Sequence, residues 1–469
     1  MYINCHSVFS LRYGTLRVKE LLNLAKLNQI TALALTDINN TSASLNFIRE
    51  AQEQAIKPIV GIDFRNGVSQ QFVALAKDNK GFMTLNNYLS SFLHEKAKIP
   101  ERPEKLKGVF IVYPFHKYKN HFLRLAKNEF IGIRLDELQN LPFSAWKNHQ
   151  ERLVLLQPVS INSKRDFNIH RLLRAIDNNI LLSRLSTTEL CSIEDQMQAK
   201  EYVEQSLKDY PQILENTQYL LDACAIDFVY KGNQKSGAVN HNKETFTGSK
   251  AADSALLKAE AYQGLDYRYP NKEDQEEVKP RLEKELKLIL EQGFESYFLI
   301  NWDMLRFARE QGFFYVGRGS GANSVVAYLL RITDVDPIKL DLYFERFINP
   351  YRENPPDFDI DFSWKDRDAI TDYLFEKYGG KGQIALLATY NTFSHKSLKR
   401  ELGKVFGLPK GELDLLSAEK VQQKQPDDLV RLIYRYSGYM DGIPSHLSIH
   451  AGGVIISEQP IHYYSATSM

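Results

Sequence analysis

The chain has 469 residues, and its 59 Lys and Arg nearly balance its 58 Asp and Glu, which leaves a formal net charge of +1. Charge therefore gives no overall attraction to nucleic acid, and any such binding must come from a local basic surface. A hydrophobic share of 43% excludes a disordered tail, and the length predicts two to four domains at roughly 100 to 200 residues each. No apolar run approaches the roughly 18 residues that cross a bilayer, and a signal peptide is not visible, so we expect a cytoplasmic protein without a membrane partner.

The N-terminal part of the chain alternates expected strands and helices. Apolar periodicity predicts a helix over residues 17–28, a buried strand over 30–35, a second helix through residue 51 and a strand over 58–62. This alternation predicts a parallel α/β layer, in which chemistry gathers at the carboxyl ends of the strands. Short strands expected at 108–113, 130–134 and 153–156 extend this domain to about residue 225.

Residues 231–250 are polar and rich in Gly, Ser and Asn, and we expect a linker and a domain boundary there. Helices are expected after it at 276–292, where Gly293 is the stop, at 298–309 and at 325–330. The last of these helices follows directly from a glycine-rich segment at 317–324.

Three carboxylates alternate with apolar residues in the segment 357–362. In an extended chain Asp357, Asp359 and Asp361 would project from one face, about 6.6 to 7 Å apart, while the apolar residues bury the other face. Such a row repels itself unless cations neutralise it, and two Mg²⁺ ions that clamp a phosphoryl displacement would suit it. A calcium loop is the weaker alternative, because Phe362 replaces the glycine it needs, and a solvated acidic strand edge stays possible.

The glycine-rich segment could bring backbone N–H groups close to phosphate oxygens at a helix start. It lacks the Gly-Lys-Ser or Gly-Lys-Thr ending of a Walker A loop and fits a dinucleotide fingerprint only loosely. Glycines that permit tight packing are the structural alternative. Arg318 within the segment and the acidic row about 40 residues later favour a nucleoside triphosphate with metal.

Further on, Lys396, Lys399, Arg400 and Lys404 recur at helical spacing, which predicts a basic face toward nucleotide or DNA phosphates. A solvated surface helix is the alternative. His446 and His450 are four residues apart and could bind a metal if helical, but the neighbouring glycines favour a structural or phosphate-facing role.

Four segments together resemble a known family. The sequences GRGSGANSVVAYLLRITDVDP, YFERFINP, PPDFDIDF and HAGGVIIS occur in the order seen in the alpha subunits of bacterial DNA polymerase III, the C-family replicative polymerases. The resemblance implies an α/β and α+β multidomain protein. Its expected parts are a PHP-type (β/α) barrel-like domain over 1–225, a nucleotidyltransferase-like palm related to that of polymerase beta over 226–388, a small helical thumb over 389–445, and a returning palm segment over 446–469.

The same resemblance implies roles for individual residues. Asp357 and Asp359 match the first two catalytic, metal-binding aspartates, with Asp361 as a supporting carboxylate. The nucleotide-binding positions of the family match Arg318, Gly319, Ser320, Arg346, Lys396 and Arg400. The implied reaction is template-directed transfer of a nucleotide from a dNTP to a primer 3′-OH with two Mg²⁺ ions. The implied partners are primer–template DNA and, in a full-length protein, other replisome subunits such as the clamp and the proofreading subunit.

The PHP pattern departs from family members that bind metal there. The expected ligand motifs read Asn4-Cys5-His6, Thr36-Asp37-Ile38, Gly61-Ile62-Asp63 and Pro158-Val159-Ser160, so only His6, Asp37 and Asp63 remain as possible ligands. A trinuclear metal cluster needs more donors, so we expect 3′ exonuclease or phosphoesterase activity to be lost and the domain to be structural.

The chain also stops before the position of the family's third catalytic aspartate. We therefore expect a truncated chain that is inactive or weakly active alone. Two alternatives remain: a non-catalytic fragment that binds nucleic acid or a partner, and a metallophosphoesterase that acts through the PHP domain.

Overall fold

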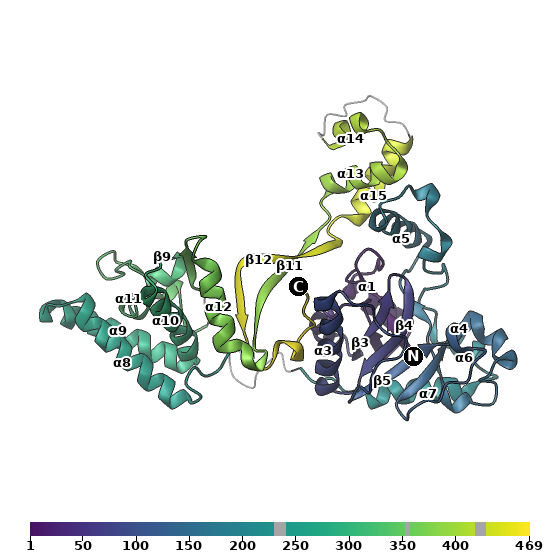
Figure 1. The fold of residues 1–469 in the computed structure, drawn as a ribbon, viewed down its shortest axis with the longest axis horizontal. Helices are drawn as coiled ribbons and strands as arrows, with labels where there is room; N and C mark the ends of the chain where they lie inside the picture. The colour runs from purple at the N-terminus through teal and green to yellow at the C-terminus, as the bar shows by residue number, and fades with distance from the viewer. Residues whose placement is uncertain (229–240, 352–356, 418–427) are drawn as a thin grey trace. The chain divides into compact units, whose positions relative to one another are not determined.

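The computed structural model describes residues 1–228, 241–351, 357–417 and 428–469 (Figure 1). The chain forms two compact units, each assembled from separate parts of the sequence. The first contains Met1–Phe228, Ala388–His450 and His462–Met469, and the second contains Val229–Leu387 and Ala451–Ile461. Within the described residues, every helix is too short or too polar to cross a membrane.

The first unit is built on a curled, open sheet of eight strands. The strands are β1 (Tyr2–Cys5), β2 (Ala32–Leu35), β3 (Lys57–Asn66), β4 (Ser69–Ala76), β5 (Val109–Pro114), β6 (Glu129–Ile133), β7 (Leu153–Leu155) and β8 (Pro158–Val159). Their order is β7-β6-β5-β4-β3-β2-β1-β8. The expectation of a purely parallel layer is wrong at β4, which pairs antiparallel with both β3 and β5 because a tight turn at Gly67, with φ +60°, joins β3 to β4.

Amphipathic helices cover this sheet. They are α1 (Val18–Leu27), α2 (Ser44–Glu53), α3 (Asn79–Glu95), α4 (Phe115–Tyr118), α6 (Lys200–Ser206) and α7 (Pro211–Ala223). In α1 the buried residues Val18, Leu21, Leu22 and Ala25 recur at helical spacing, as the sequence predicts. Leu220 and Leu221 of α7 join Ile3, Ile59 and other strand residues in the sheet's core.

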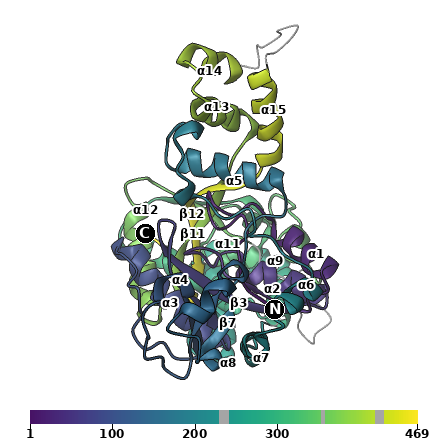
Figure 2. The same cartoon turned by 90° about the vertical axis from the view of Figure 1, so that its right-hand side faces the viewer.

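Helix α5 (Lys164–Asp177) belongs to the N-terminal segment but packs against helices from the later part of the chain. These are α13 (His395–Phe406) and α15 (Asp428–Met440), and α14 (Lys410–Ser417) packs in turn on α13. Leu172 and Leu173 of α5 share one hydrophobic core with Leu398 and Leu402 of α13 and Ile433 of α15. Figures 1 and 2 both show α5 beside α13 and α15. In the first unit, two segments that are distant in the sequence therefore pack around a common core.

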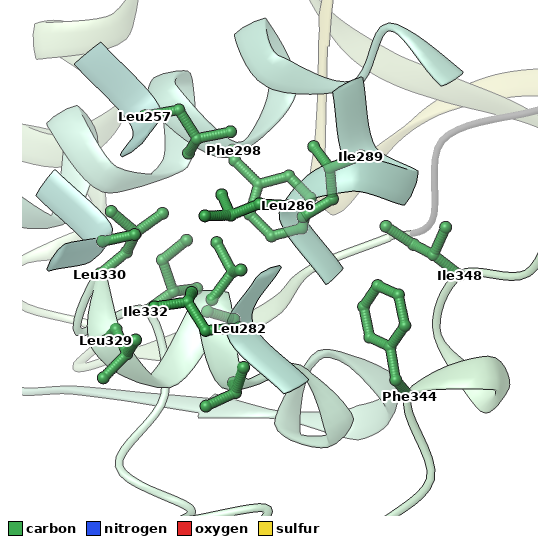
Figure 3. Packing of buried hydrophobic residues seen from close by; sticks show 14 of the residues in the cluster. Leu257, Leu282, Leu286, Ile289, Phe298, Leu329, Leu330, Ile332, Phe344 and Ile348 are labelled. Carbon is green, nitrogen blue, oxygen red and sulfur yellow. The ribbon is translucent and has the colours of Figure 1, made fainter. Parts of the chain in front are cut away.

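The second unit is mostly helical. Its helices are α8 (Lys250–Arg268), α9 (Lys272–Gln292), α10 (Glu295–Glu310), α11 (Val325–Leu329) and α12 (Arg367–Tyr378). The core gathers Leu257 of α8, Leu282, Leu286 and Ile289 of α9, Phe298 of α10 and Leu329 of α11 (Figure 3). As expected, α9 ends at Gly293, which adopts a left-handed conformation with φ 69°.

Two small sheets complete the fold. Strands β9 (Tyr315–Arg318) and β10 (Asp359–Phe362) form an antiparallel pair in the second unit. Strands β11 (Ile384–Thr392) and β12 (Pro444–Ile456) pair with each other, and the division between the units falls within both of them. The chain is thus a mixed α/β protein, with a curled half-barrel sheet followed by a mostly helical region with small sheets.

Candidate nucleotide and metal site

Pairing of β9 with β10 gives the acidic segment one exposed face and one buried face. Asp359 lies opposite Arg318 and Asp361 opposite Val316 in the strand register. Side chains alternate along a strand, so both aspartates are exposed, while Phe358, Ile360 and Phe362 pack against the core of the second unit. The alternation of acidic and apolar residues in the sequence therefore corresponds to an exposed acidic face over a buried apolar one.

A glycine turn lies directly beside this acidic face. Gly319 follows β9, begins a short 3₁₀ turn (Gly319–Asn323) and has a φ of +70°. A Cβ atom added at Gly319 would lie 2.4 Å from Oδ2 of Asp359, closer than any real contact. The left-handed backbone favours glycine here, and any side chain would also force the carboxylate of Asp359 to shift. The turn and the carboxylate of Asp359 are consequently neighbours.

Arg318 neutralises the acidic face. Its Nε donates to Oδ2 of Asp361 at 2.6 Å, and its Nη1 lies 3.9 Å from Oδ2 of Asp359. The hydrogen bond with Asp361, followed by the attraction of both carboxylates, raises the pKa of Arg318. The two carboxylates are both near Arg318, and their negative charges together stabilise a cation at this position.

The donor atoms on this face suit a hard cation. Carboxylate oxygens are the ligands that Mg²⁺ prefers, and Asp359 and Asp361 already converge on a shared positive group. Asp357 is exposed and lies two residues before β10. In the described part of the chain, no three His, Cys, Asp or Glu residues are grouped so that they could hold a metal ion, so Asp357 is not brought into a set with the other two.

Two further predicted nucleotide positions lie in the same unit. Ser320 is half-buried within the glycine turn, and Arg346 is exposed at the end of a 3₁₀ helix (Phe344–Arg346) that contacts this turn. Lys396 and Arg400 are exposed on α13, which belongs to the first unit. Their role at a nucleotide stays a prediction.

The expected basic face of α13 is wrong at Lys399. This residue is 3% exposed, and its ammonium lies 4.4 Å from the centre of the Tyr434 ring. Lys399 shares the buried side of α13 with Leu402, three residues later, so its charge is stabilised by the aromatic face. Arg400 and Lys404 lie near Asp414 and Glu401, at 3.6 and 2.6 Å. A phosphate that binds Arg400 or Lys404 would therefore compete with the carboxylates of Asp414 and Glu401.

His446 and His450 lie in the strand β12 and not in a helix. The condition under which the two histidines could bind one metal ion is therefore not met. Four residues of strand separate two positions by about 13 Å. His446 instead contacts the amide of Asn391 at 3.2 Å across the β11–β12 pair.

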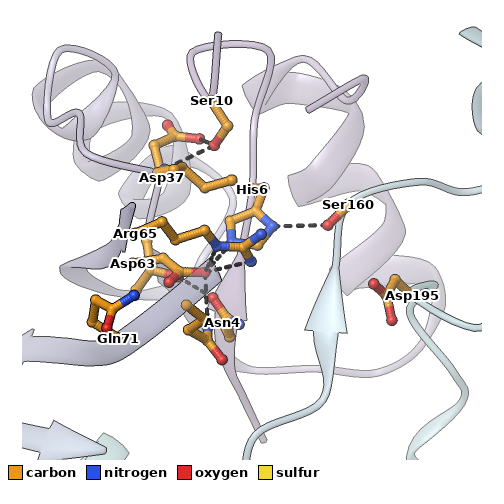
Figure 4. A network of polar contacts seen from close by, with 12 residues as sticks. Asn4, His6, Ser10, Asp37, Asp63, Arg65, Gln71, Ser160 and Asp195 are labelled. Carbon is orange, nitrogen blue, oxygen red and sulfur yellow. Dashed lines mark hydrogen bonds and ion pairs between the residues drawn. The ribbon is translucent and has the colours of Figure 1, made fainter. Parts of the chain in front are cut away.

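Of the three residues expected from the PHP resemblance, His6 and Asp37 follow β1 and β2 and Asp63 lies within β3, and Arg65 lies among them (Figure 4). Ring nitrogens of the buried His6 contact Oγ of Ser160 at 2.8 Å and Oδ2 of Asp63 at 3.0 Å. The guanidinium of Arg65 donates to the same Asp63 oxygen at 2.9 and 2.7 Å. A buried cation of the protein itself thus pairs with Oδ2 of Asp63, while the buried Oδ1 has no hydrogen-bond partner.

Asp37 is held in a separate arrangement. Its oxygens accept hydrogen bonds from the backbone and hydroxyl of Ser7 and from the hydroxyl of Ser10, at 2.6 to 2.7 Å. Burial raises the pKa of Asp37 against these hydrogen bonds. Asp63 is paired with Arg65, and Asp37 already accepts hydrogen bonds from Ser7 and Ser10. The residues present therefore do not fit a metal cluster. Arg65 was not among the predicted site residues. Its position two residues after Asp63 places both side chains on the same strand face, and this spacing could have indicated their contact.

Comparisons with known proteins connect these features. Residues 255–469 match the family of the bacterial DNA polymerase III alpha NTPase domain, and residues 3–132 match the PHP domain family. An error-prone DNA polymerase of Symbiobacterium thermophilum is 29% identical over 98% of this chain and 48% of its own length. The DNA polymerase III subunit alpha of Bacillus subtilis is 30% identical over 98% of this chain and 45% of its own length. The chain therefore spans less than half the length of these curated relatives.

Proposed function

Because this chain belongs to the bacterial DNA polymerase III alpha family and corresponds to its N-terminal part, with the PHP and polymerase NTPase regions, we propose that it contributes the nucleotide and metal site of a DNA-directed DNA polymerase. The proposed reaction joins a dNTP to a primer 3′-OH opposite a template in DNA replication or repair. Primer–template DNA and dNTP are the proposed partners, with clamp and proofreading subunits as further ones.

In this proposal the second unit acts as a palm of the nucleotidyltransferase type. The proposed palm covers residues 226–388 with a returning segment at 446–469, of which Ala451–Ile461 belong to the second unit and the flanking residues to the first. The helices of 389–445 act as a thumb, and residues 1–225 form a structural PHP-type domain. The proposed boundaries agree with the linker composition at 231–250. The exposed acidic face beside a glycine turn supports the palm assignment.

The proposed chemistry follows from charge and geometry. Asp357 and Asp359 act as the catalytic carboxylates, and Asp361 supports them. Bound to these oxygens, Mg²⁺ would supply charge neutralisation and orientation of the phosphates. Backbone N–H groups at Gly319 and Ser320 can donate to phosphate oxygens. Arg318 can exchange the carboxylate of Asp361 for a phosphate oxygen, because a guanidinium pairs with either anion.

One observation supports this proposal most: the carboxylate of Asp359 lies directly against the turn at Gly319. A phosphate held by the turn would lie beside the carboxylates that bind its metal. A redox dinucleotide site has no need of an acidic row at this position.

Replacing the central carboxylate tests the proposal. In Asp359→Asn we expect Mg²⁺-dependent binding of dNTP by this chain to weaken at least about tenfold, while the fold is kept, and single-nucleotide extension of a primer to be lost when the substitution is made in a full-length context. The matched control is Asp368→Asn on α12, which removes an 83% exposed carboxylate of the same unit and should behave as the wild type.

Two results would reject the proposal. Unchanged nucleotide binding and extension in Asp359→Asn would remove the assignment of the carboxylates. Absence of any dNTP binding by the wild-type chain would remove the nucleotide site. Binding without extension would retain the binding role and reject the catalytic one for this chain.

A further inference from the structure

Beneath the glycine turn lies a carboxylate that the proposed chemistry does not use. Glu285, on α9, is fully buried, with 0% of its surface exposed. Its Oε2 accepts hydrogen bonds from the hydroxyl of Ser324 at 2.8 Å and from the backbone N–H of Val326 at 3.2 Å. Both donors lie where the 3₁₀ turn ends and α11 begins. Glu285 therefore binds the C-terminal end of the glycine segment from the core side.

Arg281, one helical turn earlier on α9, extends these contacts. Its Nε donates to Oε1 of Glu285 at 3.0 Å, and its Nη2 donates to the backbone carbonyl of Asn323 at 2.7 Å. The side chain of Asn323 in turn donates to the carbonyl of Ser320 at 2.9 Å. A continuous set of hydrogen bonds thus runs from α9 to Ser320, a proposed phosphate-binding residue.

The position of Glu285 is unfavourable for stability alone. Its neighbours along the inner face of α9 are Leu282, Leu286 and Ile289, so a leucine would suit the surrounding core. Burial raises the pKa of Glu285 to about 7, although bonds from α11, Arg281 and Ser324 oppose this shift. A charged group kept in an apolar core at such a cost is explained when its hydrogen bonds specify one conformation of the polar segment above it.

We propose that Glu285 and Arg281 are positioning residues that fix the backbone of residues 319–324 in the conformation that receives the nucleotide phosphates. This inference rests on the proposed nucleotide site. Neither residue touches the nucleotide. Their effect passes through the carbonyl of Asn323, the hydroxyl of Ser324 and the N–H of Val326.

The test measures the turn directly, by amide hydrogen exchange of residues 319–324 in the full chain, together with the affinity for dATP with Mg²⁺. Glu285→Gln keeps the size of the side chain and one acceptor oxygen, but its NH₂ group cannot accept from Arg281. We expect exchange at 319–324 to become about tenfold faster and dATP binding to weaken about tenfold, as for other residues that orient a binding group.

Asp303→Asn is the matched control. Asp303 is a second buried carboxylate of the same unit, 1% exposed, and accepts hydrogen bonds from Tyr373 at 2.7 Å and Arg306 at 2.9 Å, as well as from Lys377. These contacts join α10 to α12 and do not involve the glycine turn. We expect Asp303→Asn to lower the melting temperature, with exchange at 319–324 and dATP affinity unchanged.

A double variant distinguishes a joint effect of Arg281 and Glu285 on the turn from a general loss of stability. If both side chains act through one hydrogen-bond set, Arg281→Met combined with Glu285→Gln should weaken dATP binding by less than the sum of the two single variants. Should Glu285→Gln fail to fold, Arg281→Met removes the bonds to Oε1 of Glu285 and to the carbonyl of Asn323 and must still speed exchange at 319–324 for the inference to stand.

The outcomes distinguish this inference from the proposed function. Wild-type exchange and dATP affinity in Glu285→Gln would overturn the positioning role while leaving the nucleotide site intact. Failure of the wild-type chain to bind dATP would overturn the nucleotide site, and the exchange measurement would then decide alone whether the pair fixes the turn. Equal effects of Asp303→Asn and Glu285→Gln on exchange would also overturn it.

Discussion

The carboxylate of Asp63 is fully buried, yet its pKa lies at about 2. Burial alone would raise the pKa of Asp63, but the attraction of Arg65 and the hydrogen bond from His6 outweigh it. Arg65 is itself buried and lies 4.8 Å from the centre of the Tyr13 ring. A guanidinium thus supplies, at a PHP position, the positive charge that metal ions would otherwise supply to the carboxylate.

Removing this cation should therefore be costly. In Arg65→Met the charge of Asp63 would remain buried without its partner, and we expect a loss of about 3 to 5 kcal/mol in the free energy of unfolding of the first unit. Denaturant unfolding of the full chain measures it. Arg12→Met is the control, because Arg12 pairs with Asp177 at 3.4 Å in an exposed position and should contribute less than about 1 kcal/mol.

The pH dependence checks that this loss is electrostatic. Because the folded pKa of Asp63 lies below its usual value of 3.8, the stabilisation is present above pH 4 and is lost as the pH falls toward 2. The difference between wild type and Arg65→Met should shrink over the same window. A difference that is constant from pH 6 to 2 would assign the effect to packing instead.

At the scale of elements, the glycine turn joins β9 to the helical part of the second unit. A side chain at Gly319 would meet both a left-handed φ and the carboxylate of Asp359. We expect Gly319→Ala to weaken dNTP binding by about tenfold or more, since the turn must move away from the acidic face. Isothermal titration of dATP with Mg²⁺ measures the change.

Gly312 offers a matched control for the backbone alone. It has a φ of +74°, and an added Cβ would meet no atom within 4 Å. Gly312→Ala should therefore cost about 1 to 2 kcal/mol of stability through the left-handed backbone while dNTP binding stays at the wild-type value. Equal loss of binding in both variants would show that the contact with Asp359 is unimportant.

Local patterns predicted the elements well where periodicity was strong. The helices expected at 17–28 and 276–292 are present as α1 and α9, and the acidic segment forms a strand. Strand β4 was missed, although the dipeptide Asn66-Gly67 before it is a recognised hairpin signal. The contacts of His6 with Asp63 and of Glu285 with Ser324 could not be predicted, because each pair is distant in the sequence and meets only through tertiary packing. Lys399 was misjudged because helical spacing alone does not tell which side of a helix is covered.

At the scale of the whole molecule, the first unit is discontinuous in the sequence. Helix α5 of the N-terminal segment and helices α13 and α15 of the later segment share one core, in which Leu173 and Leu402 are fully buried. A core of this kind couples the stability of the segments that build it, because each buries the apolar face of the other. Helices α13 and α15 should therefore unfold together with α5.

Truncating one side of this core tests the coupling. We expect Leu402→Ala on α13 to cost about 2 to 5 kcal/mol and to speed amide exchange in α5 as well as in α13 and α15. Leu173→Ala on α5 should produce the reciprocal change. Leu27→Ala on α1, at a 78% exposed leucine, should alter stability by less than about 0.5 kcal/mol. Faster exchange confined to residues 395–440 in Leu402→Ala would show that the later helices fold independently and that the shared core does not couple them to the PHP region.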